Sequence, residues 1–184
     1  MAVRVVSGSA RGTKLKTVAS RQIRPTSDKV KESVFNILQF RISGTMVLDL
    51  FCGSGALGIE ALSRGALQAD FVDQSARSLA VAKENLIHTR LLDRARLLQF
   101  DWRNFLKSYA FTQNYDIIFA DPPYAMEALH TLLVLIAQRR LLCEDGILVF
   151  EGPEELIPVQ AEGFALMKDV KYGSTRILMY QNLG

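Results

Sequence analysis

The fold is decided by the stretch Asp49-Leu50-Phe51-Cys52-Gly53-Ser54-Gly55-Ala56-Leu57-Gly58. An apolar run precedes it and a stretch with helical periodicity follows, so the glycines predict a tight turn between a buried strand and a helix. The glycines have the spacing G-x-G-x-x-G, and Asp73 follows twenty residues after the first of them. This pattern is typical of a nucleoside-binding loop in which the acid binds the ribose hydroxyls.

The chain around this loop alternates between short apolar runs and helical stretches. Strands are expected at 46–51, 69–72, 95–100, 116–120 and 146–150, and helices at 56–63, 76–87, about 102–109 and 126–137. Such alternation predicts a mostly parallel sheet with helices on both faces, an α/β fold. In the tail, Gly173 separates two apolar runs with no helix between them, which predicts a C-terminal antiparallel hairpin.

The first forty-one residues differ from the remainder in charge. Segment 1–41 has nine Lys/Arg against two Asp/Glu, a net charge of +7, whereas 42–184 has a net charge of −4. Residues 3–18 alternate in a way that predicts a short β-hairpin with one basic face, and a helix follows from Thr26 or Ser27. We therefore expect a basic N-terminal extension, 1–41, packed on a catalytic domain, 42–184. Its partner is a polyanion or its charges form an ordinary solvated face.

The composition indicates an ordinary globular protein. The 184 residues are 49% hydrophobic and 22% charged, which fits one domain and excludes disorder and coiled coil. The sequence has no apolar run of about 18 residues, and its first residues lack the apolar core expected of a signal peptide. The two cysteines lack the spacing of a disulfide or zinc framework. We expect a cytoplasmic protein with no membrane partner and no metal.

Asp49 distinguishes between the ligands that such a loop binds. A carboxylate beside the first glycine opposes a pyrophosphate but suits S-adenosylmethionine (SAM), whose sulfonium and α-amino groups are cationic. Asp101 is placed to accept from the adenine amino group, although Asp49 and Asp101 could instead cap turns. A nicotinamide or flavin dinucleotide remains the alternative. The expected cofactor-binding residues are Asp49, Phe51, Gly53, Ser54, Gly55, Asp73, Gln74, Asp101 and Trp102.

A second motif, Asp121-Pro122-Pro123-Tyr124, follows the fourth expected strand. Two prolines stiffen the loop, and ligands bind at the carboxyl ends of strands in open α/β sheets. The Asp121 carboxylate and the Pro122 carbonyl can accept both hydrogens of an exocyclic base nitrogen, and Tyr124 can stack on the base. This arrangement indicates methyl transfer to an amino group, with Asp121, Pro122, Pro123 and Tyr124 as catalytic residues.

With both motifs in place, the chain resembles class I SAM-dependent methyltransferases and, more narrowly, the RsmD family of bacterial 16S rRNA guanine-N2 methyltransferases. The shared segments are Arg4-Val5-Val6-Ser7-Gly8, Arg11-Gly12, Arg24-Pro25-Thr26, Phe35-Asn36-Ile37-Leu38, 48–58, 60–66, Asn85-Leu86, 121–124 and Tyr172-Gly173. The resemblance implies a Rossmann-like seven-stranded sheet, SAM as methyl donor, and one guanine of 16S rRNA as target, usually within the 30S subunit.

The basic extension then becomes an expected phosphate-binding surface for folded RNA. Its candidate RNA-binding residues are Arg4, Arg11, Lys14, Lys16, Arg24 and Thr26. The target guanine is expected to be single-stranded or flipped out, and the protein to be a monomer. Two alternatives remain, an adenine-N6 methyltransferase acting on RNA or DNA and a non-catalytic RNA-binding assembly factor. Phe35 and Asn36 either contact SAM or the base, or lie in the core and on the surface respectively.

Overall fold

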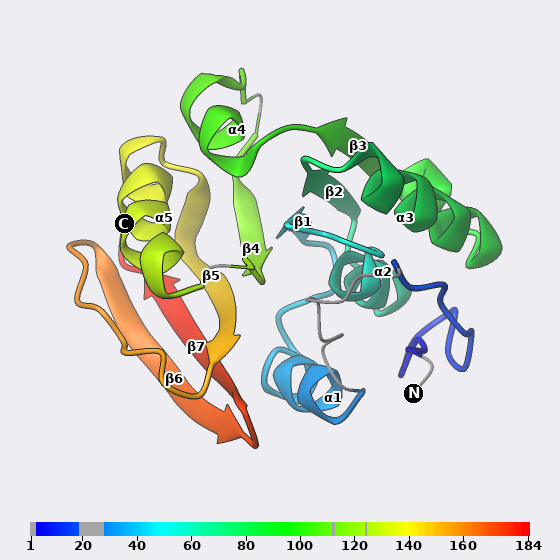
Figure 1. The fold of residues 1–184 in the computed structure, drawn as a ribbon, viewed down its shortest axis with the longest axis horizontal. Coiled ribbons are helices and arrows are strands. Elements are labelled where there is room, and N and C mark those ends of the chain that lie inside the picture. Colours follow the sequence, from blue (N-terminus) through cyan, green and yellow to red (C-terminus); the bar gives the residue numbers. More distant parts are fainter. Residues whose placement is uncertain (1–2, 19–27, 112, 124) are drawn as a thin grey trace.

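A seven-stranded sheet forms the centre of the molecule in a computed structural model that describes residues 3–18, 28–111, 113–123 and 125–184 (Figure 1). The strand order is β3-β2-β1-β4-β5-β7-β6. Strands β1 to β5 are parallel to one another, and β7 is antiparallel to both β5 and β6. The strands are β1 Met46–Leu50, β2 Gln68–Asp73, β3 Ala95–Gln99, β4 Tyr115–Ala120, β5 Leu142–Pro153, β6 Phe164–Tyr172 and β7 Thr175–Asn182. The mostly parallel sheet and the C-terminal hairpin are therefore confirmed.

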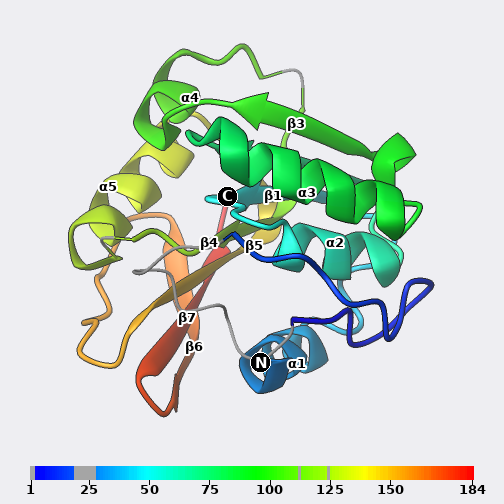
Figure 2. The ribbon, with the colours of Figure 1, turned by 45° about the vertical axis from the view of Figure 1, so that its right-hand side comes forward.

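Helices cover both faces of this sheet (Figure 2). They are α1 Asp28–Ile37, α2 Ala56–Ser63, α3 Ala76–His88, the 3₁₀ turn Leu92–Arg94, α4 Trp102–Ser108 and α5 Ala125–Gln138. Helices α1, α2 and α3 lie with the N-terminal segment on one face, and α4 and α5 lie on the other. The α/β class is thus confirmed, and each expected helix is present to within a few residues.

Alternation along the strands divides the core into two layers. Val47 and Phe119 point to the face of α1, α2 and α3, whereas Leu48 and Ala120 point to the face of α4 and α5. Strands buried on both faces are apolar without alternation, which explains the continuous apolar runs of β1 and β4. Because direction alternates, Asp49 faces the first layer, with Val47.

The order in which successive strands are added to the sheet reverses at β1, because β2 and β3 lie on one side of it and β4 lies on the other. Asp49 pairs in register with Phe71 of β2 on one side and with Phe119 of β4 on the other. Ligands in open α/β sheets bind at such a switch point, beyond the carboxyl ends of the strands. The glycine loop after β1 and the Asp121 loop after β4 both leave the sheet there.

The N-terminal segment 3–18, which we call the arm, pairs with itself but does not form two full strands. Arg4 and Lys14 make a single antiparallel bridge, and Leu15 donates its N–H to the Val3 carbonyl at 2.8 Å. The expected hairpin is therefore shorter than its pattern suggests. Its turn forms a hydrogen bond with α2, because the Ser9 N–H donates to the Ser63 carbonyl at 2.8 Å. The buried apolar residues of the arm pack in the core layer that also contains Val47 and Phe119.

Candidate functional site: carboxylates around a glycine loop

The loop after β1 is built on left-handed backbone conformations. Phe51 has φ 95°, and its N–H and that of Cys52 both donate to the Val72 carbonyl at 3.0 Å. A non-glycine residue at positive φ is unusual and is often found at functional sites. Gly53 also has positive φ, and no atom lies within 4 Å of the position that a Cβ would take. The loop therefore leaves an open space beside its backbone, as a closely bound ligand needs.

Asp49 is held at the base of this loop. Its carboxylate is 3% exposed, and its Oδ2 accepts the N–H of Gly58 at 2.9 Å. Burial, and to a smaller extent the nearby charge of Asp73, raises the pKa of Asp49 to about 7, against the lowering effect of the Gly58 hydrogen bond. A cation placed beside this carboxylate would favour its ionised form.

Asp73 connects the end of β2 to the glycine loop. Its Oδ2 accepts the Gly53 N–H at 3.0 Å, and its Oδ1 accepts the Ser75 N–H at 2.8 Å. Each carboxylate oxygen has a further lone pair, so ribose hydroxyls can still be accepted. The next residue, Gln74, is exposed beside this carboxylate.

Asp101 begins helix α4 as its N-cap. Its Oδ1 accepts the N–H groups of Arg103 and Asn104 at 3.0 and 3.1 Å, so the capping alternative is realised by this oxygen. Contact with adenine through its other oxygen stays a prediction. The Trp102 ring lies 5.7 Å from the Phe51 ring, which brings these two expected cofactor-binding residues together.

The second loop brings Asp121 to the same face of the sheet as Asp49. Register pairs Ala120 with Phe150, and both point into the α4 and α5 layer, so Asp121 points to the opposite face. Its carboxylate is partly buried. Burial, then the charges of Glu151 and Asp49, raise the pKa of Asp121 well above its usual value. Pro122 is buried and Pro123 exposed, while Tyr124 lies outside the described residues.

Glu151, which follows the last apolar run of β5, was not predicted from the sequence. It occupies in β5 the place that Asp121 occupies after β4, and it is buried. The signal was available, because an acid at the carboxyl end of a strand adjacent to Asp121 had to lie near it.

Together these residues suit a cationic ligand. Electrostatic interactions connect four carboxylates, those of Asp49, Asp73, Asp121 and Glu151. In the described ranges, every charge that shifts the pKa of Asp49 or Asp121 is another carboxylate. A pyrophosphate would meet repulsion here, whereas the sulfonium and α-amino groups of SAM would not. The open side of Gly53 and the Asp73 carboxylate fit its nucleoside. The same ranges hold no cluster of three metal-binding side chains.

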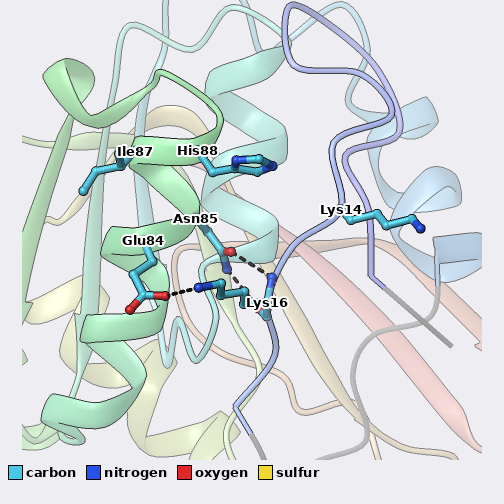
Figure 3. A pocket seen from close by; sticks show the side chains of 6 residues that line it. All are labelled: Lys14, Lys16, Glu84, Asn85, Ile87 and His88. Atoms are coloured by element: carbon cyan, nitrogen blue, oxygen red, sulfur yellow. Dashed lines mark hydrogen bonds and ion pairs between the residues drawn. The ribbon is translucent and has the colours of Figure 1, made fainter.

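The arm lies against α3 beside this site (Figure 3). Asn85 of α3 accepts the Lys16 N–H at 2.8 Å and donates to the Lys16 carbonyl and to the Ser54 carbonyl, both at 2.9 Å. The arm is therefore joined to the glycine loop by one amide. Lys16 Nζ also pairs with Glu84 at 2.6 Å.

The basic residues of the arm are exposed but not equivalent. Arg11 and Lys14 are exposed, and Arg4 pairs with Asp28 at 3.2 Å. Arg24 and Thr26 lie outside the described residues. The arm thus presents Arg11 and Lys14 most openly to a polyanion.

One of the nine basic residues counted in the N-terminal segment does not face solvent at all. Lys31 of α1 is buried, lies 3.4 Å from Glu60 of α2 and donates to the carbonyl of Arg4. Glu60 also accepts the N–H groups of Val6 and Ser7, and pairs with Arg64 at 2.8 Å. This network fixes the arm to α1 and α2, and neither residue was expected to matter from the sequence.

Phe35 belongs to the core. It is fully buried, its ring lies 5.4 Å from that of Phe119, and Arg64 stacks over it. Asn36 is exposed. The alternative in which Phe35 packs in the core and Asn36 lies on the surface is therefore the one observed.

Comparison with known proteins gives a consistent result. The model of the family described as "Conserved hypothetical protein 95" matches residues 3–181. The "Putative rRNA methyltransferase YlbH" of Bacillus subtilis is 40% identical over 99% of this chain and 100% of its own length. The "Ribosomal RNA small subunit methyltransferase D" of Haemophilus influenzae is 31% identical over 98% of this chain and 94% of its own.

A solved structure agrees in fold. The "Putative methyltransferase yhhF from Escherichia coli" superimposes with a TM-score of 0.86 and 28% identity, covering 99% of this chain and 98% of that one. Among the helices of the described segments, none is long and apolar enough to cross a membrane.

Proposed function

The chain belongs to the family described as conserved hypothetical protein 95, the RsmD family, and on that premise we propose that it methylates the exocyclic N2 of a guanine in small-subunit ribosomal RNA, with SAM as donor. The proposal rests on the placement of Asp121, which Pro122 follows in the chain, beside the buried carboxylate of Asp49 at the base of the glycine loop. Support comes also from the relatives, whose names assign them to methylation of ribosomal RNA.

The glycine loop and its acids form the cofactor side of the site. Asp73 binds the ribose hydroxyls, and Asp49 provides negative charge for the cationic end of the cofactor. Phe51 and Trp102 border the nucleoside. Bound SAM supplies a methyl group on a sulfonium sulfur, which is a strong electrophile.

Asp121 and Pro122 form the base side. The carboxylate of Asp121 and the carbonyl of Pro122 accept the two N2 hydrogens, which turns the nitrogen lone pair towards the methyl group. Positive charge that develops on the nitrogen is stabilised by the Asp121 carboxylate. The methylated amine is strongly acidic, so its proton passes to Asp121 or to water, and no stronger base is required.

The arm binds phosphates outside the reaction centre. Arg11 and Lys14 provide sequence-independent contacts that position the RNA. The guanine leaves its stack to reach Asp121, since in-line attack needs room around N2. We further propose that the substrate is rRNA within the assembled or assembling 30S subunit, and that the protein acts in the cytoplasm as a monomer.

Labelled SAM tests this function directly. Small subunits from a strain that lacks the activity, and naked small-subunit rRNA, are incubated with the protein and methyl-tritiated SAM. The wild-type protein is expected to label rRNA, and Asp121→Ala to lose labelling while retaining SAM binding in calorimetry. Asp93→Ala, an exposed acid in the 3₁₀ turn, serves as the matched control. Full activity of Asp121→Ala would overturn the mechanism, and absence of SAM binding by the wild type would indicate a non-catalytic RNA-binding protein.

A further inference from the structure

Asn85 of α3 lies between the arm and the glycine loop and forms hydrogen bonds with both. It is 1% exposed, and its side-chain amide has one acceptor oxygen and two donor hydrogens. The oxygen accepts the Lys16 N–H at 2.8 Å, and Nδ2 donates to the carbonyls of Lys16 and Ser54, both at 2.9 Å (Figure 3). These bonds use the oxygen and both hydrogens, so one planar group holds the arm and the loop in a fixed relation.

On the arm side, Asn85 takes the place of a neighbouring strand, because it bonds to both the N–H and the carbonyl of Lys16. Leu15, the residue before Lys16, is buried and donates its N–H to the Val3 carbonyl at 2.8 Å. Lys14 is exposed. The side chain that we propose to bind an RNA phosphate is therefore two residues from the backbone that Asn85 holds.

On the loop side, Asn85 bonds to a peptide group that lies between two glycines. Gly53 and Gly55 flank Ser54 and have φ of 53° and 79°. Glycine adopts either sign of φ at similar cost, so the peptide after Ser54 has two accessible orientations. In the observed one, its carbonyl accepts from Asn85 and the Gly55 N–H donates to the Cys52 carbonyl at 2.7 Å. The amide that holds the arm therefore also selects the conformation of the expected cofactor loop.

We propose that Asn85 is a positioning residue that couples the two ligands of the site. RNA bound to the arm holds Lys16, Asn85 and the Ser54 carbonyl in place, and SAM then binds more tightly. This inference rests on the proposed function, because it connects the RNA and the cofactor that the function assigns. A loop that is already held loses less conformational entropy when the cofactor binds. Because binding free energies are linked, SAM must strengthen RNA binding by the same factor.

Two dissociation constants, each measured without and with the other ligand, test this coupling. The probes are small-subunit rRNA and S-adenosylhomocysteine (SAH), which has no methyl group and cannot react. SAH binding is measured by calorimetry without RNA and with saturating RNA, and RNA binding by filter binding without and with saturating SAH. Each protein variant is measured in the same way as the wild type.

The test variant is Asn85→Leu, which keeps the branched shape of the side chain without its hydrogen bonds. The matched control is Glu84→Gln. Glu84 precedes Asn85 in α3 and pairs with Lys16 Nζ at 2.6 Å. Its replacement therefore changes a contact with the same arm residue and leaves the amide of Asn85 in place.

The measured quantity is the coupling factor, the ratio of the SAH dissociation constants without and with RNA. We expect a factor of about five or more in the wild type, with the same value from the RNA measurements. It is expected to fall to near one in Asn85→Leu and to keep its wild-type value in Glu84→Gln. A merely structural role would weaken both ligands in Asn85→Leu but leave the factor unchanged, and that result would overturn the inference.

Hydrogen exchange of the wild-type protein gives a second measurement that needs no variant. The Gly55 N–H is buried in the loop, so its exchange reports the loop conformation, and RNA is expected to slow it. If RNA leaves either this exchange or the SAH affinity of the wild type unchanged, the inference is wrong while the proposed function stands. If the wild type fails to bind SAH or rRNA, the proposed function itself has failed.

Discussion

Gly58 donates its backbone N–H to Oδ2 of Asp49 at 2.9 Å, which ties the first turn of α2 to the end of β1. The approach is possible because Gly58 has no side chain. A Cβ there would lie 2.4 Å from Cε1 of Phe71 and 3.1 Å from Oδ2 of Asp49. The last glycine of the loop thus sets both the packing of α2 on β2 and the position of the buried acid.

Gly58→Ala is therefore expected to destabilise the protein. A methyl group forced against a buried aromatic ring costs about 1–3 kcal/mol, measured as the free energy of unfolding in urea. Replacing the ring by a smaller side chain, in Gly58→Ala/Phe71→Leu, should recover part of the lost free energy of unfolding. A single variant as stable as the wild type would show that α2 shifts freely and does not position Asp49.

Binding of SAM should strengthen as the pH rises through about 7. Burial raises the pKa of Asp49 to that value, and a cationic ligand prefers the ionised carboxylate. Calorimetry between pH 5.5 and 8, roughly one unit or more either side of this pKa, should show the dependence. Asp49→Asn should bind SAM more weakly above pH 7 and lose much of the dependence, and the remainder would come from Asp121. Identical pH profiles would contradict a role for Asp49.

Stability of the cofactor-free protein should fall as the pH rises from about 3.8 to about 7. The Asp49 carboxyl keeps its proton to about 7 in the folded protein but ionises near 3.8 when unfolded. The folded state binds more protons between these values, so the free energy of unfolding falls as the pH rises through them. Asp49→Asn removes this contribution and should flatten the curve measured by denaturant unfolding.

Much of the candidate site around the glycine loop and the Asp121 loop could be predicted from the sequence, because the sequence signals for these loops are local. The glycine spacing, the prolines after β4 and the apolar runs each determine nearby backbone, so the two loops at the carboxyl ends of β1 and β4 follow from them, whereas the neighbouring of β1 and β4 in the sheet does not. Phe51 at positive φ could not be predicted, since the loop closure that requires it depends on contacts with β2. Glu151 was overlooked because its neighbour Asp121 is adjacent only in the sheet.

Replacing Arg11 and Lys14 together by Gln should weaken RNA binding and leave SAM affinity unchanged. Both are exposed on the arm, and removing one phosphate-binding cation reduces the salt dependence of log K by about one. Filter binding at several salt concentrations would show a slope reduced by about two. Lys168→Gln, an exposed base on β6 at the far edge of the sheet, is the control. An equal loss of RNA affinity in Lys168→Gln would show that any exposed cation contributes as much as those of the arm.

Lys31→Met should detach the arm. The change leaves Glu60 buried with Arg64 as its remaining charged partner. The free energy of unfolding should therefore fall by about 3 kcal/mol, near the lower end for a broken buried ion pair. Limited proteolysis should then cut within residues 3–18 faster than in the wild type. Lys29→Met, on the exposed side of the same helix, should change neither quantity. Unaltered proteolysis of Lys31→Met would show that the arm is held by its apolar residues alone.

The charge composition of the N-terminal segment does not show which of its basic residues are exposed. Lys31 adds to the basic charge of 1–41 as much as Arg11 does, yet one is buried against Glu60 and the other is exposed. Lys31 lies on the buried side of α1, and its partner lies on a different helix. Pairings between distant segments fix which charges remain for RNA.

The identity of the methylated nucleoside shows whether the protein transfers a methyl group to guanine N2. Small-subunit rRNA treated with the protein and labelled SAM is digested to nucleosides and analysed by mass spectrometry, with Asp121→Ala alongside. N2-methylguanosine is expected as the labelled product of the wild type and is expected to be absent from the variant. N6-methyladenosine, or a wild-type protein that binds SAM but labels no nucleoside, would contradict this expectation.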